Sequence, residues 1–367
     1  MKKTTLALIL ISALFASLVI GVQSAKSTSK TITVPDDYPT IESAITNAND
    51  GDTILVKKGT YVENPVVNKS VSLIGEDRDA TVIDVTAGLR VESNGATITG
   101  FTIYDGWRGI SLSGNQCVIS GNRITNATNG IVLFGCENNS ITGNVFQSIG
   151  LSSAIQLNFA NRNLVNENYI ESCVEGIQIW QNSNNNTISE NTITNCQDTA
   201  INFQYSNDNV IVGNNISRSG LGTSIYGSNR NLISSNNYIF NVVQFGANES
   251  YYLTFGHNRS INNINGNYWS DYNGTDANGD GIGDTPYIID ENNKDNNPLI
   301  KQVSIVNPSI PVPSATVSPT TSPSTNQGAE PFPTLLVIAV TVTIVAVVAV
   351  GLLVYFKKRN IKSEVRK

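Results

Sequence analysis

The chain has 367 residues with a formal net charge of −6, and it contains one His, one Met and four Cys. An activity that needs several His or Met ligands, such as copper handling, is therefore close to excluded. Nucleic acid is a poor partner for a chain of this charge, so no nucleic-acid role is predicted. Asn is the unusual residue: it occurs 48 times, and this excess needs a structural reason.

The N-terminus has the features of a secretory signal peptide. Lysines at positions 2 and 3 precede an apolar run over residues 6–22, and the small residues Ser24 and Ala25 follow it. A charged start, a short apolar stretch and a small-residue site are typical of export signals. We therefore predict a signal peptide over residues 1–25, with an uncleaved N-terminal anchor as the alternative.

A second apolar run, residues 335–356, predicts a transmembrane helix. It contains 22 residues without a charge. A helix of that length spans about 33 Å, which is enough to cross a hydrocarbon core. The basic tail at residues 357–367 follows directly and is predicted to be cytoplasmic. This topology makes the chain a single-pass membrane protein with its N-terminal part outside the cell.

Residues 301–334 are predicted to form an extended stalk. Seven of the twelve prolines fall between Pro308 and Pro333, together with many Ser and Thr. This composition cannot bury a core and favours extended conformers. Residues 26–334 carry 15 basic and 28 acidic side chains, a net −13. An acidic ectodomain suits solubility and cation binding rather than polyanion binding.

The middle of the chain, residues 96–270, repeats itself. The recurring string is apolar-x-Gly-Asn-x-apolar, as in Ile119 to Ile124 and Ile141 to Phe146. The motif Asn occurs at positions 122, 144, 168, 191, 214, 236 and 267, in steps of 22 to 24 residues and a last step of 31. A repeat of this length indicates a solenoid, because propeller blades are longer and the Leu ladder of leucine-rich repeats is missing.

Each repeat also contains a segment in which apolar and polar residues alternate, such as Gly130 to Leu133 and Gly176 to Ile179. Period-two alternation predicts strands with one buried face. Two or three short strands per repeat, joined by Gly and Asn turns, fit one coil of a parallel solenoid. We therefore predict an all-β parallel β-helix of about ten coils, stacked at about 4.8 Å.

The repeated Asn residues have a structural role in this interpretation. Asn tolerates left-handed backbone angles and bonds to the neighbouring backbone, so it suits tight turns. Stacked Asn side chains can also hydrogen-bond from coil to coil. At the N-terminal end, Thr40 followed by Ile41, Ala44, Ile45 and Ala48 predicts a short helix that caps the open sheet edge.

Three strings near the N-terminus, Val34 to Ile45, Gly51 to Val56 and Gly59 to Glu63, resemble the opening of right-handed parallel β-helix proteins of the pectin-lyase-like group. The repeats and the ending Gly266 to Tyr272 resemble the NosD-like β-helix family. That family includes periplasmic accessory proteins of nitrous-oxide reductase and archaeal membrane-anchored surface proteins. The resemblance covers about residues 31–300, which we take as the ectodomain.

The family name implies a role in copper or cofactor maturation. The sequence argues against this role, since His257 and the four Cys are the soft donors that follow the signal peptide. Because a fold does not by itself carry a function, the residues of the candidate sites must decide.

The predicted C-terminal cap, residues 266–300, contains a calcium-loop-like motif. Its oxygen ligands follow the order of an EF-hand loop, with Tyr287 where that loop has its final Glu. The proposed ligands are Asp276, Asn278, Asp280, the carbonyl of Ile282, Asp284 and, from nearby, Asp290. We predict a structural calcium site here, and an Asx-Gly turn without metal is the alternative.

The four cysteines are Cys117, Cys136, Cys173 and Cys196. Outside the cell, four cysteines suggest two disulfides. Cys173 and Cys196 each follow a motif Asn by five residues, so they are expected on adjacent coils, within bridging distance. The other two are also one coil apart but three positions out of register. A ladder of buried thiols is the alternative.

The second strand of each repeat presents amides and aromatic residues between its buried positions. This set comprises Phe134, Gln156, Asn158, Gln178, Trp180, Asn202, Gln204 and Tyr226. Amides can hydrogen-bond sugar hydroxyls, and aromatic rings can pack on sugar C–H groups. The strip is therefore a candidate carbohydrate-binding face, and an ordinary solvated strand face is the alternative.

Polysaccharide lyases and hydrolases need clustered carboxylates. The candidates in the repeats are Glu167, Glu171, Glu175, Glu190 and Asp198. The alternative is that scattered acidic residues on an acidic surface serve solubility.

The favoured function is a non-catalytic, membrane-anchored cell-surface protein that binds a polysaccharide, a surface glycan or a surface protein. A polysaccharide lyase or hydrolase is the second hypothesis, and cofactor maturation is the third. Calcium is the predicted cofactor, in a structural role.

Overall fold

The computed structural model describes residues 29–246 and 260–305. The predicted signal peptide, the stalk from residue 306, the predicted transmembrane helix and the basic tail lie outside these residues. Within the described part of the chain, none of the helices has the length and apolar character that crossing a membrane requires.

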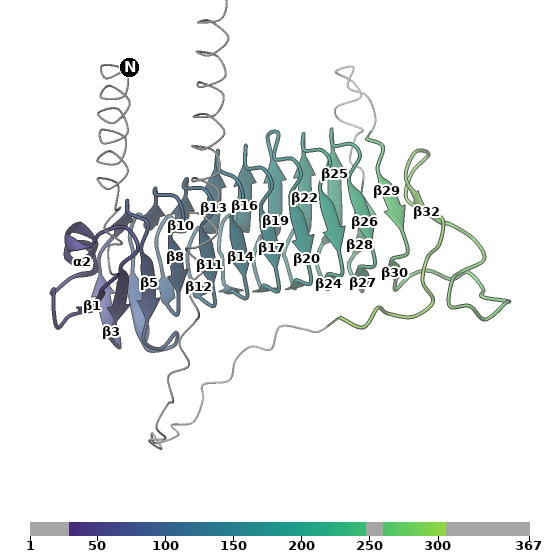
Figure 1. The fold of residues 1–367 in the computed structure, drawn as a ribbon. Coiled ribbons are helices and arrows are strands. Elements are labelled where there is room, and N and C mark those ends of the chain that lie inside the picture. Colours follow the sequence, from purple (N-terminus) through teal and green to yellow (C-terminus); the bar gives the residue numbers. More distant parts are fainter. Residues whose placement is uncertain (1–28, 247–259, 306–367) are drawn as a thin grey trace, which may run out of the picture. The chain divides into compact units, whose positions relative to one another are not determined.

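The described residues form a parallel β-helix in which each full coil contributes one short strand to each of three sheets (Figure 1). Each strand pairs in parallel with the strand one coil later, so neighbours in a sheet are distant in sequence. One sheet contains ten strands, and the solenoid therefore has about ten turns, as the repeat predicts.

The 13-stranded sheet collects the first strand of each coil. In spatial order it contains β1 (Thr31–Val34), β2 (Thr53–Val56), β5 (Ser72–Gly75), β8 (Thr97–Thr99), β11 (Val118–Ser120), β14 (Ser140–Thr142), β17 (Leu164–Asn166), β20 (Thr187–Ser189), β23 (Val210–Val212), β26 (Leu232–Ser234), β29 (Asn263–Asn265), β32 (Lys294–Asp295) and β31 (Tyr287–Ile288). The last pair, β31 and β32, is antiparallel and ends the stack.

The ten-stranded sheet follows after a sharp turn. It contains β3 (Gly59–Val62), β6 (Thr81–Asp84), β9 (Thr102–Tyr104), β12 (Arg123–Thr125), β15 (Val145–Gln147), β18 (Tyr169–Glu171), β21 (Thr192–Thr194), β24 (Asn215–Ser217), β27 (Asn237–Ile239) and β30 (Tyr268–Trp269).

The nine-stranded sheet holds the longest strands of the solenoid. It contains β4 (Val66–Val67), β7 (Leu89–Val91), β10 (Arg108–Leu112), β13 (Asn129–Phe134), β16 (Ser153–Asn158), β19 (Glu175–Trp180), β22 (Thr199–Gln204), β25 (Leu221–Tyr226) and β28 (Val243–Gly246).

The core consists of columns of identical or similar side chains. In the nine-stranded sheet, Ile110, Ile131, Ile155, Ile177 and Ile201 stand in register on consecutive coils, and all are fully buried. Because side chains alternate across a strand, the residues between them form columns on the other face. A one-residue slip would exchange the two sets, so the apolar alternation fixes the register.

The motif Asn residues form a buried ladder, which confirms their predicted structural role. Asn191 is representative and is fully buried. Its Nδ2 donates to the Val165 carbonyl (3.0 Å) and to Oδ1 of Asn214 (2.9 Å). Its own Oδ1 accepts from the backbone N–H (2.9 Å) and Nδ2 (3.0 Å) of Asn168. The ladder thereby satisfies polar groups of three consecutive coils.

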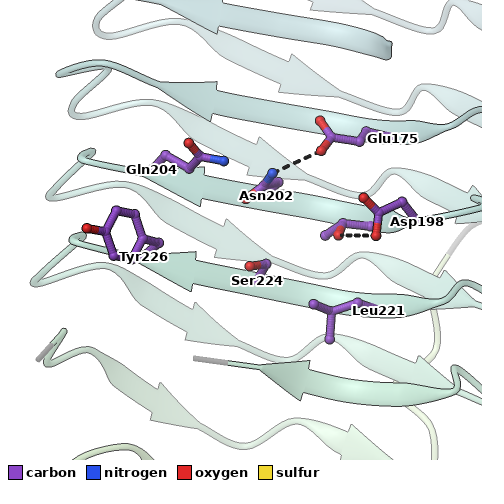
Figure 2. Close-up of a pocket in the computed structure, with 8 residues that line it drawn as sticks. Glu175, Asp198, Asn202, Gln204, Leu221, Ser224 and Tyr226 are labelled. Atoms are coloured by element: carbon purple, nitrogen blue, oxygen red, sulfur yellow. Dashed lines mark hydrogen bonds between the residues drawn. The ribbon is translucent and has the colours of Figure 1, made fainter. Parts of the chain in front are cut away.

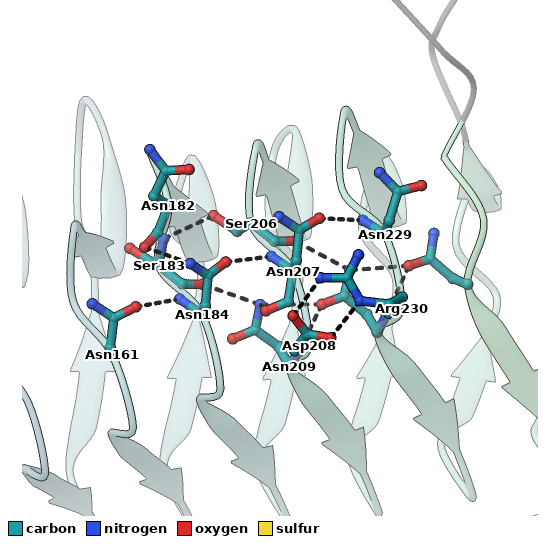
Figure 3. A network of polar contacts seen from close by, with 12 residues as sticks. Asn161, Asn182, Ser183, Asn184, Ser206, Asn207, Asp208, Asn209, Asn229 and Arg230 are labelled. Carbon is teal, nitrogen blue, oxygen red and sulfur yellow. Dashed lines mark hydrogen bonds and ion pairs between the residues drawn. The ribbon is translucent and has the colours of Figure 1, made fainter.

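Parallel ladders line the turn after the nine-stranded sheet (Figure 3). The backbone N–H of Asn186 donates to Oδ1 of Asn209 at 2.8 Å, and both side chains are fully buried. Closer to the surface, the backbone N–H of Asn207 donates to Oδ1 of Asn184 at 2.7 Å. The pattern explains why Asn is so frequent in this chain.

Both ends of the described stack are covered. The predicted N-terminal helix is confirmed as α2 (Ile41–Asn47), capped by Thr40, whose Oγ1 accepts from Ser43 N–H at 3.0 Å. At the other end the Asn ladder stops at Asp295, a buried carboxylate in the ladder position. Its Oδ2 accepts from Asn267 N–H (2.8 Å) and from Nε1 of Trp269 (3.1 Å).

Replacing one rung should destabilise the solenoid. Asn191→Ala removes the donor to the Val165 carbonyl and leaves the backbone N–H of Asn168 without its acceptor in a buried site, which costs about 3 kcal/mol or more. We expect a lower guanidinium midpoint for unfolding of the purified protein.

Asn195→Gly is the matched control for this rung. Asn195 is an exposed turn residue with φ 56° that Gly also adopts, so its effect should stay below about 0.5 kcal/mol. Equal midpoints for the two variants would contradict the structural role of the ladder.

Candidate functional site

The outer face of the nine-stranded sheet brings together the amides and aromatic residues predicted from the sequence. Strand pairing aligns them in two columns, one along each set of outward positions. The first column is Val132, Gln156, Gln178, Asn202 and Ser224, and the second is Phe134, Asn158, Trp180, Gln204 and Tyr226.

These side chains are less uniformly exposed than the alternation predicts. Phe134 is 59% exposed, whereas Asn158 (8%), Asn202 (7%) and Tyr226 (7%) are buried. The alternative of an ordinary solvated strand face therefore does not describe these three, because neighbouring side chains on the same face cover them. Asn202 bonds to Glu175, and Tyr226 packs against Tyr205.

Oδ1 of Asn158 is a buried acceptor for which the structure shows no hydrogen-bond partner within the described residues. Such orphaned acceptors are uncommon in folded proteins and call for an explanation at each site. This one lies in the second column, in register between Phe134 and Trp180.

Five aromatic side chains on five consecutive coils form what we call the aromatic ridge. Its members are Phe134, Phe159, Trp180, Tyr205 and Tyr226. Two edge-to-face pairs lie at its ends, Phe134 with Phe159 (ring centroids 6.1 Å apart) and Tyr205 with Tyr226 (5.0 Å). At strand spacing, five coils extend the ridge over about 19 Å along the solenoid axis.

Phe159 and Tyr205 were missed by the sequence analysis. Each directly follows the last residue of its strand, where alternation assigns no outward side chain. Both adopt left-handed backbone angles (φ 51° for each), which turn their rings toward those of neighbouring coils. The available signal was the recurrence of one aromatic residue per coil at this edge of the sheet.

A pocket of about 300 Å³ opens on the same face, across β19, β22 and β25 (Figure 2). It is lined by Glu175, Asp198, Thr199, Asn202, Gln204, Leu221, Ser224 and Tyr226. Tyr226 and Gln204 lie at one end and the two carboxylates toward the other, as Figure 2 shows. A six-residue strand spans about 16 Å between such ends, so the pocket is elongated and adjoins the aromatic ridge.

Glu175 is the electrostatically unusual residue of the pocket. Burial of its carboxylate raises its pKa, and the nearby negative charge of Asp198 adds to the rise. Hydrogen bonds from Nδ2 of Asn202 (3.0 Å) and Oγ of Ser153 (3.0 Å) act in the opposite direction. A partly buried acid beside a second carboxylate is the kind of group found at functional sites.

The five candidate catalytic carboxylates do not converge. Glu175 and Asp198 line the pocket. Glu167 and Glu190 occupy left-handed turn positions (φ 54° each) where other coils have Gly, and Glu171 lies on β18 in the ten-stranded sheet. The structure thus brings together two of the five.

The predicted calcium loop is held together by its own backbone. Asp276 accepts from the N–H groups of Gly279 (2.8 Å), Asp280 (3.1 Å) and Gly281 (3.0 Å). Asp284 accepts from Ala277 N–H at 3.0 Å. Across the described ranges, no group of three or more His, Cys, Asp or Glu side chains is placed to hold a metal ion, so calcium stays a prediction.

All four cysteines are free and buried in the structure. The Cys173 carbonyl accepts from the N–H of Gln197 at 2.8 Å, so Cys173 and Cys196 lie on adjacent coils, as predicted. The buried-thiol alternative is the state that the structure contains, and pairing into disulfides stays a prediction.

The chain belongs to the family described as periplasmic copper-binding protein (NosD), which it matches over residues 21–274. A curated relative, the cell surface glycoprotein of Methanothermus fervidus, is 32% identical over 136 residues. That match covers 35% of this chain and 22% of the relative, so the chain spans about a fifth of the relative's length.

Solved structures with some likeness include a tailspike protein and an alginate lyase. The Dettilon tailspike protein has a TM-score of 0.45 at 14% identity, with 65% of this chain and 62% of that chain covered. An alginate lyase from Paenibacillus sp. has a TM-score of 0.42 at 15% identity, with 65% and 94% covered.

The residues present do not fit the copper site that the family description implies. Copper prefers Cys, Met and His ligands, and a cysteine must lose its proton to bind. Burial raises the pKa of Cys136, Cys173 and Cys196 to about 12 and also raises that of Cys117. These thiols therefore stay protonated, and the described residues include neither Met nor His.

The raised pKa of Glu175 predicts how the stability of the fold depends on pH. Because its folded-state pKa lies above the ordinary value of 4.5, the ionised carboxylate destabilises the fold at pH values above the raised pKa. That penalty disappears as the pH falls below 4.5, where the group is protonated in both states. Glu175→Gln should therefore melt above the wild type at neutral pH, and the two melting temperatures should converge in acid. A constant difference across the pH range would contradict this assignment.

Proposed function

We propose that this protein is a cell-surface β-helix protein that binds carbohydrate on the outer face of its nine-stranded sheet. The single observation that supports the proposal most is the aromatic ridge running beside three amides of the first column, Gln156, Gln178 and Asn202. Both are presented at regular intervals by consecutive coils.

A location outside the cytoplasm is supported by the comparisons. The family is described as periplasmic, and the Methanothermus relative is named a cell surface glycoprotein. We further propose that residues 335–356 anchor the chain in the membrane, on the basis of their uncharged apolar composition.

The chemistry of the face suits sugars. Aromatic rings present flat apolar surfaces to the C–H faces of a pyranose while costing little side-chain entropy. Amides offer both a donor and an acceptor to hydroxyl groups. Gln178 and Gln204 are partly exposed beside Trp180, so both kinds of contact are available at one place.

The direction of the ridge favours a polymer over a single sugar. Consecutive coils repeat the same kind of contact at about 4.8 Å along the axis. A chain with its own short repeat can therefore touch several members of the ridge at once. Each contact is modest, and several together give useful affinity.

Hydrolysis of the polymer is the second candidate, favoured by the presence of Glu175 and Asp198 in one pocket. A glycoside hydrolase needs one protonated and one ionised carboxyl group across the scissile bond. Release of reducing ends from any bound polysaccharide would support this candidate. A lyase has less support, because the lining contains no Lys or Arg to act as a base.

The ridge can be tested by binding to a panel of neutral, amino and uronic-acid polysaccharides. Phe134→Ala and Tyr205→Ala should each lower the affinity for a bound polysaccharide about tenfold, because exposed aromatic anchors dominate such interfaces. Affinity electrophoresis or calorimetry on the full chain measures the effect.

The chain offers matched controls away from the ridge. Phe240 (70% exposed) and Tyr104 (42% exposed) resemble Phe134 and Tyr205 in type and exposure but lie on other faces. Phe240→Ala and Tyr104→Ala should leave binding unchanged. If all four variants behave alike, or no polysaccharide binds, the proposed face is wrong.

We also propose that calcium fastens the C-terminal cap through the loop from Asp276 to Asp284. The proposal is supported by the spacing of the oxygen ligands in the sequence. Added calcium should raise the melting temperature of the purified protein, and EDTA should reverse the rise. Asp276→Asn should abolish the response, whereas Asp105→Asn, at an exposed turn, should retain it. An unchanged melting curve would rule out the calcium site.

A further inference from the structure

We propose that the pocket across β19, β22 and β25 selects sugars that carry a free, protonated amine over neutral and uronic-acid sugars. The inference rests on the proposed function and names the class of polysaccharide that it would take. The charge of the pocket supports this selectivity independently of the aromatic ridge.

The lining of the pocket contains two carboxylates and no cation. Glu175 and Asp198 come from adjacent coils, and the other six lining residues are uncharged. In strands β16 to β25 and their turns, residues 153–226, the basic residues are Arg162 and Arg218. Arg162 is paired with Glu137 at 2.8 Å, and Arg218 is exposed in the turn before β25.

Neither carboxylate of the pocket has an ion-pair partner among the described residues, although ion pairs occur elsewhere on the solenoid, as between Arg230 and Asp208. The negative charge of Asp198 is one of the causes that raise the pKa of Glu175. Bringing a cation between like charges lowers their mutual repulsion and adds attraction. The charges of the pocket therefore favour binding of a positively charged group.

The hydrogen-bonding capacity of the two acids leaves room for an ammonium group. Oε1 of Glu175 accepts from Asn202 and Oε2 accepts from Ser153, one bond each. Oδ1 of Asp198 accepts a long bond of 3.4 Å from Oγ1 of Thr199. A carboxylate has about four acceptor positions, so each of the two groups keeps free acceptor positions for the N–H donors of a protonated amine.

The rest of the pocket fits a sugar ring around that amine. Gln204 and Ser224 supply neutral polar groups for hydroxyls. Leu221 supplies an apolar contact near the carboxylates, and Tyr226 links the pocket to the ridge. A uronic-acid polymer would instead bring a third and fourth negative charge into the same space.

The test compares three soluble oligosaccharides of equal length by calorimetry with the full chain. They are a β-1,4-glucosamine oligomer with free amines, its fully N-acetylated form, and an oligogalacturonate. The measurement is made at mildly acidic pH, where the amines are protonated. Charge-assisted hydrogen bonds predict that the free-amine oligomer binds about tenfold or more tightly than the acetylated form.

The variant Glu175→Gln/Asp198→Asn should remove this preference by lowering the affinity for the free-amine oligomer about tenfold or more. Both changes are isosteric, and circular dichroism checks that the fold is retained. Because the whole ectodomain is acidic, a polycation could also bind without specificity. The matched control is Glu167→Gln/Glu190→Gln, which removes two turn carboxylates outside the pocket and should leave the preference intact.

The outcomes separate this inference from the proposed function. Equal affinities for the free-amine and acetylated oligomers, or a loss of preference in both double variants, would overturn the amine selectivity while the carbohydrate-binding face stands. Tight binding of oligogalacturonate that requires added calcium would overturn it as well, since the carboxylates would then hold a metal.

If none of the three oligomers binds, while a different polysaccharide binds in a ridge-dependent way, the amine selectivity fails but the proposed carbohydrate-binding function stands. If nothing in the wider panel binds, the proposed function fails too.

Discussion

Hydrogen bonding between consecutive coils is the interaction on which the rest of this structure depends. Each coil is too short to bury its apolar residues alone, so it is stable only when its neighbours cover both sides. The Asn ladders strengthen this dependence, because each buried amide bonds the coil before it and the coil after it. A shift in register would leave these amides unsatisfied in the core as well as exposing the Ile columns.

The same register produces the candidate site. An outward residue acquires most of its functional neighbours from the adjacent coils, since the residues directly before and after it in its strand point inward. The aromatic ridge and the first column of outward residues are therefore products of stacking, with one contribution per coil. A surface built this way repeats at strand spacing, which suits a polymeric partner better than a compact one.

Two carboxylates of the solenoid, those of Asp295 and Glu175, lie in different electrostatic environments. Asp295 is fully buried at the end of the Asn ladder, where backbone and side-chain N–H groups from the coil before it satisfy the carboxylate. Glu175 is also withdrawn from water, but it accepts two side-chain hydrogen bonds and faces another negative charge. The first arrangement stabilises the cap. The second weakens the fold at neutral pH, which is a reason to look for a ligand there.

The sequence by itself determined the parallel β-helix, the N-terminal helical cap and the structural role of the motif Asn. These features follow from local periodicity, since alternation fixes which side chains are buried and the repeat length fixes the coil. It also identified Phe134, Trp180, Gln178 and Gln204 as outward residues of one sheet. Tertiary structure alone decided that Phe159 and Tyr205 join the ridge, because their left-handed turn conformation is not encoded in the alternation. It also decided that Glu175 meets Asp198 while Glu167 and Glu171 lie elsewhere. The physical reason is that such neighbours belong to different coils, and their meeting depends on the length of every turn between them.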